Sequence, residues 1–187
     1  VLENSTITLL SNTEWPSGSL KIRKNVIILG AFWWKHSSPL PCKIEAKSSL
    51  TIDKEATFYF APSQPSSEGI LFANKSGVLH LHNGHLRSGA WGLTLRSGTL
   101  LVSGQCTAHA ENNDPGYGIS LGTGERAHDN MAFILASPDS TLKVTAPFFN
   151  EKKSTASLMQ SFLTTARAVG IAAAIYLIYE VHQILSN

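Results

Sequence analysis

The chain has 187 residues, of which only 15% are charged, and its formal net charge is +2. This balance excludes the strong positive field with which proteins attract nucleic acid, so we expect no nucleic-acid partner. Two cysteines, Cys42 and Cys106, are too few for a disulfide framework or a zinc cluster. The repeat described below places them on different strands and about two coils apart, so we predict that they are not bonded to each other. We also predict that the fold requires no metal and no organic cofactor, because stacked apolar side chains should supply its core.

A short apolar unit recurs along the first 150 residues. It consists of a leucine, any residue and a second apolar residue, and it begins at Leu20, Leu50, Leu79, Leu100 and Leu142. A second unit occupies residues 42–44, 70–72, 93–95 and 119–121, and a glycine precedes the last three of these. Middle segments such as residues 26–29 and 56–60 lie between the two units. Each repeat therefore predicts about three short strands joined at corners rich in Gly, Ser, Asn and Pro.

Side chains alternate between the two faces of a strand, so we expect Leu79 and Leu81 to point inward and His80 and His82 outward. One coil cannot bury its inward face alone, whereas stacked coils can. The sequence thus predicts an all-β fold, a right-handed single-stranded parallel β-helix of about five coils. The five leucines that begin the first unit are expected to form one inward ladder. Their unequal spacing requires corner loops of different length.

The pattern is clearest between residues 76 and 121, SGVLHLHNGHLRSGAWGLTLRSGTLLVSGQCTAHAENNDPGYGISL. This stretch resembles β-helices of the pectin-lyase-like and autotransporter-passenger kind. The resemblance is to a fold and carries no signature of one activity. Polysaccharide lyases of this fold bind substrate in a groove lined by Asp, Lys and Arg, and no such set is matched here position by position. The alternative fold is an antiparallel sandwich, in which Asn83 and Gly84 would form a hairpin turn.

Phe32, Trp33 and Trp34 form an aromatic cluster directly after a predicted strand. Aromatic rings stack on sugars and anchor protein partners, so the cluster is a candidate binding site. The same residues could instead pack beneath the first coil or against the tail, and the sequence leaves both interpretations open.

The longest predicted loop contains a second candidate site, which consists of Glu125, Arg126, His128 and Asp129. Loops on a rigid scaffold often carry function, and this mixture of acid and base suits proton transfer. No further partner can be placed beside the two acids, so no catalytic residue is predicted.

His80, His82 and His85 resemble a cluster of metal ligands. No acidic or cysteine side chain is spaced along the sequence to complete such a site. We interpret the three histidines as part of a solvated outer face and predict no metal ligand. One coil later, His109 is expected near His85.

Residues 151–187 differ in composition from the rest of the chain, because they are rich in apolar residues and poor in Gly and Pro. Residues 168–179 form an unbroken apolar run, and no proline follows residue 154. We expect one continuous helix from about residue 157 to 185. Its apolar part, residues 162–179, is close to the length of about 20 residues that a bilayer core requires. A row of small residues would permit close helix packing, with bulky residues opposite: Ala166, Gly170 and Ala174, and Ile171, Ile175 and Ile178. The alternative is a buried helix that caps the solenoid.

The expected organisation is a β-helix over residues 1–150 and a hydrophobic helix over residues 151–187. The expected function is that of a non-enzymatic structural or interaction protein, membrane-associated and exported or at the cell surface. Its C-terminal helix would contact membrane lipid or associate with further copies of itself. Its β-helix would bind a protein or glycan partner. The alternatives are a carbohydrate-binding or carbohydrate-active protein with its site around Trp33 and Glu125, and a membrane-inserting toxin.

Overall fold

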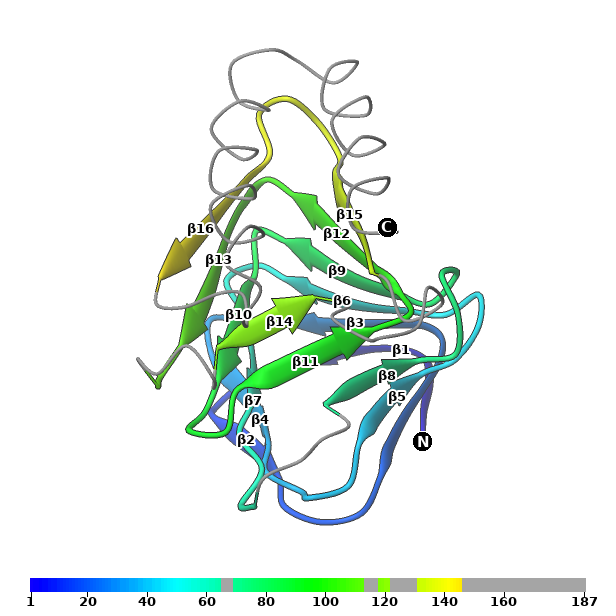
Figure 1. The fold of residues 1–187 in the computed structure, drawn as a ribbon, viewed down its shortest axis with the longest axis vertical. Helices are drawn as coiled ribbons and strands as arrows, with labels where there is room; N and C mark the ends of the chain where they lie inside the picture. Colours follow the sequence, from blue (N-terminus) through cyan, green and yellow to red (C-terminus); the bar gives the residue numbers. More distant parts are fainter. Residues whose placement is uncertain (65–68, 113–117, 122–130, 146–187) are drawn as a thin grey trace, which may run out of the picture.

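A computed structural model describes residues 1–64, 69–112, 118–121 and 131–145. Their strands build a parallel β-solenoid of about four turns (Figure 1). This confirms an all-β solenoid, and the expected number of about five coils is corrected to about four. The parallel pairing of Leu79 with Leu100 excludes the antiparallel sandwich.

A turn contributes three short strands, one to each side of the solenoid. The N-terminal strands are β1 (Leu2–Thr8), β2 (Thr13–Trp15), β3 (Leu20–Leu29) and β4 (Trp33–His36). The turns that follow consist of β5 (Cys42–Ile44), β6 (Ser49–Asp53) and β7 (Thr57–Phe60); β8 (Ile70–Phe72), β9 (Val78–His82) and β10 (His85–Ser88); β11 (Leu93–Arg96), β12 (Thr99–Ser103) and β13 (Gln105–Ala110); and β14 (Ile119–Leu121), β15 (Ala132–Leu135) and β16 (Thr141–Thr145).

The stacked strands form two sheets. The large sheet has the order β14-β11-β8-β5-β3-β6-β9-β12-β15, with β1 beside β3, and the small sheet has the order β16-β13-β10-β7-β4-β2. Strand β3 is long enough to pair with both β5 and β6. It therefore joins two rows of strands, and the large sheet covers two sides of the solenoid while the small sheet covers the third (Figure 1).

The predicted leucine ladder is correct in its centre. Leu50, Leu79 and Leu100 are register partners on β6, β9 and β12, and all three are fully buried. The ladder continues to Val26 on β3 and to Phe133 on β15. Apolar side chains stacked in this way supply the core that no single turn could form.

The two outer members of the predicted ladder were placed wrongly. Leu20 pairs with Cys42 in the other row of the large sheet, and Leu142 pairs with Cys106 in the small sheet. The cause is that a leucine followed by a second apolar residue occurs on all three sides of the solenoid, so the motif alone does not identify the side.

The alternation along β9 agrees with the prediction. Leu79 and Leu81 are buried, His80 is half-buried and His82 is exposed. The next corner leads from β9 to β10 and is not a hairpin. Here Asn83 has a φ of 49°, and a Cβ on Gly84 would lie 2.3 Å from the carbonyl oxygen of Ile52 in the turn below. Only glycine permits this close approach between turns.

The two cysteines are free and buried, as predicted. Cys42 lies on β5 of the large sheet and Cys106 on β13 of the small sheet. Burial raises the pKa of the Cys42 thiol to about 12 and also raises the pKa of Cys106. The Cys42 thiol is therefore protonated at neutral pH in the folded protein.

The proposed C-terminal helix lies outside the described residues. Within the described ranges, no helix is long and apolar enough to cross a membrane.

Candidate functional site

The outer surface of the small sheet brings together aromatic and charged side chains from four segments of the chain. We call the set Trp33, Lys35, Tyr59, Arg87 and Glu111 the aromatic–charged face. Lys35, Tyr59 and Arg87 are consecutive register partners on β4, β7 and β10. Their sequence neighbours Trp34, Phe58 and Leu86 are buried, so strand alternation directs these three side chains outward.

The ring of Tyr59 is the centre of this face. The guanidinium carbon of Arg87 lies 4.9 Å from the ring centroid, and the Lys35 ammonium lies 5.8 Å from it. The Trp33 ring meets Tyr59 edge to face, with centroids 6.2 Å apart. Cations near an aromatic face and edge-to-face rings are both electrostatically favourable, so these contacts fix the orientation of Tyr59.

Glu111 follows β13 and accepts two hydrogen bonds at the same oxygen. The Tyr59 hydroxyl donates to Oε1 over 2.8 Å, and an Arg87 guanidinium nitrogen donates over 2.7 Å. Burial raises the pKa of Tyr59 to about 12, and the hydrogen bond and negative charge of Glu111 contribute in the same direction. The phenol therefore keeps its proton at neutral pH and acts as a donor.

A second carboxylate, Glu14, lies at the β2 end of this face. The Ser37 hydroxyl donates to its Oε1, and the Lys35 ammonium lies 3.4 Å from the same oxygen. The hydrogen bond from Ser37 lowers the pKa of Glu14, and the Lys35 charge lowers it further. Both Glu14 and Glu111 thus serve as acceptors for neighbouring donors. This arrangement suits recognition better than proton transfer.

The predicted aromatic cluster is divided by the strand alternation. Phe32 is 40% exposed at the corner before β4, and Trp33 is half-buried on the outer face. Trp34 belongs to the core, where its ring packs against Phe58 at 5.5 Å. Phe32 and Trp33 are therefore accessible to a partner, whereas Trp34 packs in the core, so each of the two interpretations of the cluster holds for different members of it.

The other predicted site residues lie outside the described residues. They are Glu125, Arg126, His128 and Asp129 of the loop, and Ala166, Gly170, Ile171, Ala174, Ile175 and Ile178 of the proposed helix.

The histidine-rich stretch is separated into two places. His80 and His82 lie on the large sheet with their rings stacked at 5.7 Å and 13°. His85 lies on the small sheet, where its Nδ1 is 2.8 Å from the hydroxyl of Thr107. His109 lies on the neighbouring strand β13, as the register partner of Arg87 and two residues from Thr107, the register partner of His85.

The register supplies partners for His80 and His82 that could not be found by spacing. His80 Nε2 lies 2.7 Å from the Ser103 hydroxyl, and His82 Nδ1 lies 3.3 Å from a carboxylate oxygen of Asp53. Burial lowers the pKa of His80, and the neighbouring His82 charge lowers it as well. Within the part of the chain that is described, no group of three or more His, Cys, Asp or Glu side chains is arranged to hold a metal.

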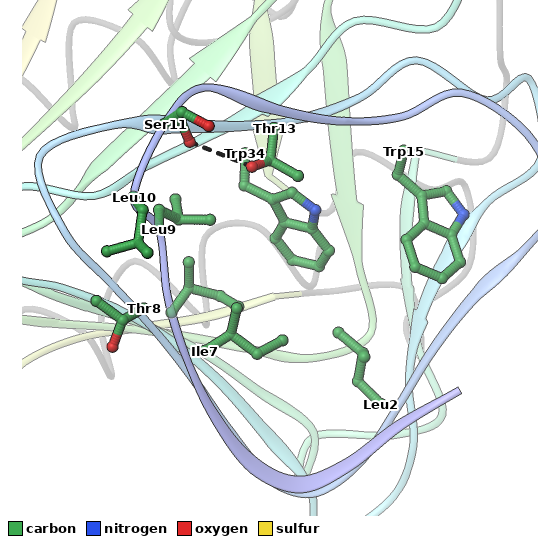
Figure 2. Close-up of a pocket in the computed structure, with 10 residues that line it drawn as sticks. Leu2, Ile7, Thr8, Leu9, Leu10, Ser11, Thr13, Trp15 and Trp34 are labelled. Atoms are coloured by element: carbon green, nitrogen blue, oxygen red, sulfur yellow. Dashed lines mark hydrogen bonds between the residues drawn. The ribbon is translucent and has the colours of Figure 1, made fainter.

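An apolar cavity of about 390 Å³ opens at the N-terminal end of the solenoid. Its lining includes Leu2, Ile7, Leu9, Leu10, Trp15 and Trp34 (Figure 2). In the described structure β2 pairs only with β4, and β1 only with β3, so this end exposes both strand edges and core side chains. Leu10 is 85% exposed beside the cavity.

Sequence reasoning missed Lys35, Tyr59, Arg87 and Glu111. They are separated along the chain and converge only through the stacking of β4, β7, β10 and β13. The available signal was that three strands of the small sheet, β4, β7 and β10, each have a large polar or aromatic residue at the third position, namely Lys35, Tyr59 and Arg87.

Comparisons with protein-family models, curated proteins and solved structures gave no significant match.

Proposed function

We propose that this protein is a non-enzymatic interaction protein whose β-solenoid presents the aromatic–charged face to a partner. The observation that carries the proposal is the arrangement around Tyr59, which is held by Arg87, Lys35 and Trp33 and hydrogen-bonded to Glu111. Trp, Tyr and Arg dominate the binding energy of protein interfaces. Side chains that are already ordered lose little conformational entropy on binding, which favours affinity.

In this proposal the right-handed solenoid is attached through residues 151–187. The amino-acid sequence supports a helix in which the small residues Ala166, Gly170 and Ala174 form one row, and such a helix would insert into a membrane or associate with copies of itself. Insertion into a membrane would attach the solenoid to a cell surface. A charge introduced by Ile175→Lys is expected to abolish flotation of the full chain with phospholipid vesicles, whereas Lys153→Ala should leave it unchanged.

The binding proposal is tested by photo-crosslinking from the full-length chain. A benzophenone amino acid at position 33 lies on the aromatic–charged face, and the same group at Lys43 lies on the exposed outer face of β5 as a matched control. We expect one discrete adduct from position 33 in extracts of the natural source, and loss of that adduct when Arg87→Ala is added. Equal adduct patterns from both positions, or none from position 33, would contradict the proposal.

A glycan is the second candidate partner, because Phe32 and Trp33 expose aromatic surface side by side at one corner. Binding of the full chain to immobilised polysaccharides, compared with the variant Trp33→Ala, separates this candidate from a protein partner. Release of sugar fragments in the same assay would instead indicate a carbohydrate-active enzyme.

A further inference from the structure

Positive charge is concentrated where β3 and β5 lead to the corner before β6. Six exposed cations lie there, and we call them the basic corner: Lys21, Arg23, Lys24, Lys43, Lys47 and Lys75. Two carboxylates, Glu3 and Glu45, lie among them. Six cations against two carboxylates give this corner a net charge of +4, whereas the whole chain has +2. The remainder of the molecule is therefore not positive, and its basic surface is this corner.

Lys24, Lys47 and Lys75 occupy the same corner in three successive turns. The backbone N–H of Lys24 donates to the Ser48 hydroxyl over 2.9 Å, and that of Lys47 donates to the Ser76 hydroxyl over 2.8 Å. Lys24 and Lys47 also share a φ of 54°, so their corners have the same backbone conformation. Successive turns lie about 4.8 Å apart. The three lysines thus form a row along the solenoid axis.

Beside this row the large sheet places like charges opposite each other. Lys21 on β3 is the register partner of Lys43 on β5, and both are exposed. Like charges in this position are destabilising. Arg23 and Glu45 on the same two strands form an ion pair at 3.2 Å, but no carboxylate of the described residues pairs with either lysine. An external anionic surface would relieve the repulsion.

We propose that the basic corner docks the side of the solenoid on a bilayer that contains anionic phospholipid. A corner between two sides of the solenoid is convex, so it suits a flat surface and cannot enclose a polymer strand (Figure 1). Five of its six cations are lysines, which act as point charges and need no fixed partner geometry, as suits mobile headgroups. The basic corner contains no aromatic residue on which an unpaired base could stack. Its members are spread over residues 21–75, so their spacing along the sequence did not reveal it.

Partition of the full chain between buffer and sedimentable vesicles tests the proposal. One vesicle consists of phosphatidylcholine, and the other consists of phosphatidylcholine mixed with phosphatidylserine. We expect tighter partition to the anionic vesicles at low ionic strength. The preference should disappear in about 1 M NaCl, where charges are screened beyond about 3 Å.

The double variant Lys47→Gln with Lys75→Gln should reduce the preference for anionic vesicles about 25-fold, because each basic residue near such a surface raises affinity about 5-fold. Lys54→Gln with Lys143→Gln is the matched control, since it removes two exposed lysines that lie outside the basic corner and lowers the net charge equally. All four side chains are exposed, so both double variants should fold. Equal losses in the two, or equal partition of the unmodified chain to both vesicles, would overturn the proposal.

The test is independent of the proposed helix. Insertion of residues 151–187 would raise partition to both vesicles alike, and flotation with neutral vesicles measures that contribution by itself. Ile175→Lys should therefore retain the preference for anionic lipid. Tighter binding of the unmodified chain to duplex DNA than to the anionic vesicles, at equal phosphate concentration, would overturn the proposal in favour of a nucleic-acid partner.

Discussion

Arg87 and Tyr59 are joined twice on the outer face of the small sheet. The Arg87 guanidinium carbon lies 4.9 Å from the centroid of the Tyr59 ring, and both side chains donate hydrogen bonds to Oε1 of Glu111. The three residues come from β7, from β10 and from the position after β13, so the cluster bridges three successive turns. Each contact restricts the other two, and removing one member should therefore release the whole group.

Glu111→Gln should lower the pKa of Tyr59, which is about 12 in the unmodified protein. Glutamine preserves the size of the side chain and removes the negative charge that opposes ionisation of the phenol. Burial is the largest cause of the upward shift and persists in the variant, so the pKa of Tyr59 should remain above its ordinary value. Alkaline ultraviolet titration measures this, with Tyr59→Phe identifying the signal of the other tyrosines. An unchanged titration would show that Glu111 does not act on Tyr59.

Leu100→Ala should reduce the free energy of unfolding by about 2–5 kcal/mol. Leu100 is fully buried between Leu79 and Phe133, and the neighbouring turns cannot close around a cavity without breaking their strand pairing. Leu101→Ala is the matched control, because Leu101 lies next in sequence and points to the outer face. Urea denaturation followed by circular dichroism gives both values. Equal losses for the two variants would argue against the inward ladder.

His36 should make the protein sensitive to acid. It is completely buried, its Nε2 is bonded to the carbonyl oxygen of Leu40, and its Nδ1 has no hydrogen-bond partner among the described residues. Burial holds the pKa of His36 below its ordinary value, so the unfolded chain takes up a proton more readily than the folded chain. Stability should therefore be complete above about pH 6.5 and decrease as the pH falls from there toward the folded pKa.

The variant His36→Phe removes this titration and stacks on Phe60 as the imidazole does. We expect its melting temperature to change less than that of the unmodified protein between about pH 7 and pH 5. His85→Asn serves as the control, because His85 is an outward-facing residue of the small sheet, and it should keep the acid sensitivity. Equal pH dependence in all three proteins would exclude His36 as the source.

Cys42 should report the unfolding of the solenoid. Its thiol is completely buried and its pKa is raised to about 12, so a thiol reagent should not modify it in the native state. Labelling followed by intact mass should begin only in denaturant, and Cys42→Ser separates its signal from that of Cys106. Rapid modification of Cys42 in native buffer would show that β5 opens locally.

The strand segments were predictable where a glycine precedes an alternating apolar unit. Residues 70–72 and 119–121 are strands with the predicted bounds, and Leu79 and Leu81 point inward as expected. The stacking partners were less predictable, because β3 is one strand that serves two rows of the large sheet. Phe133 was overlooked as the successor of Leu100 because Leu142 repeats the same motif on another side.

The candidate site was less predictable than the fold. Phe32 and Trp33 could be selected because they are adjacent in the sequence, whereas Tyr59 and Glu111 meet only when the turns have stacked in register. Asp53 and Ser103 are inconspicuous residues at strand ends, and nothing in their local sequence associates them with His80 and His82. Contacts between turns depend on the register, which local patterns do not encode.

The stacking of β3, β6, β9, β12 and β15 also determines how the molecule would respond to mechanical force. Each of these strands is hydrogen-bonded to the equivalent strands of the neighbouring turns, so the turns are coupled as nearest neighbours. Tension applied at the C-terminal side would load β16 first, and its hydrogen bonds to β13 would open one after another rather than together. The solenoid would therefore lengthen turn by turn under tension, and each step would expose the next row of core side chains.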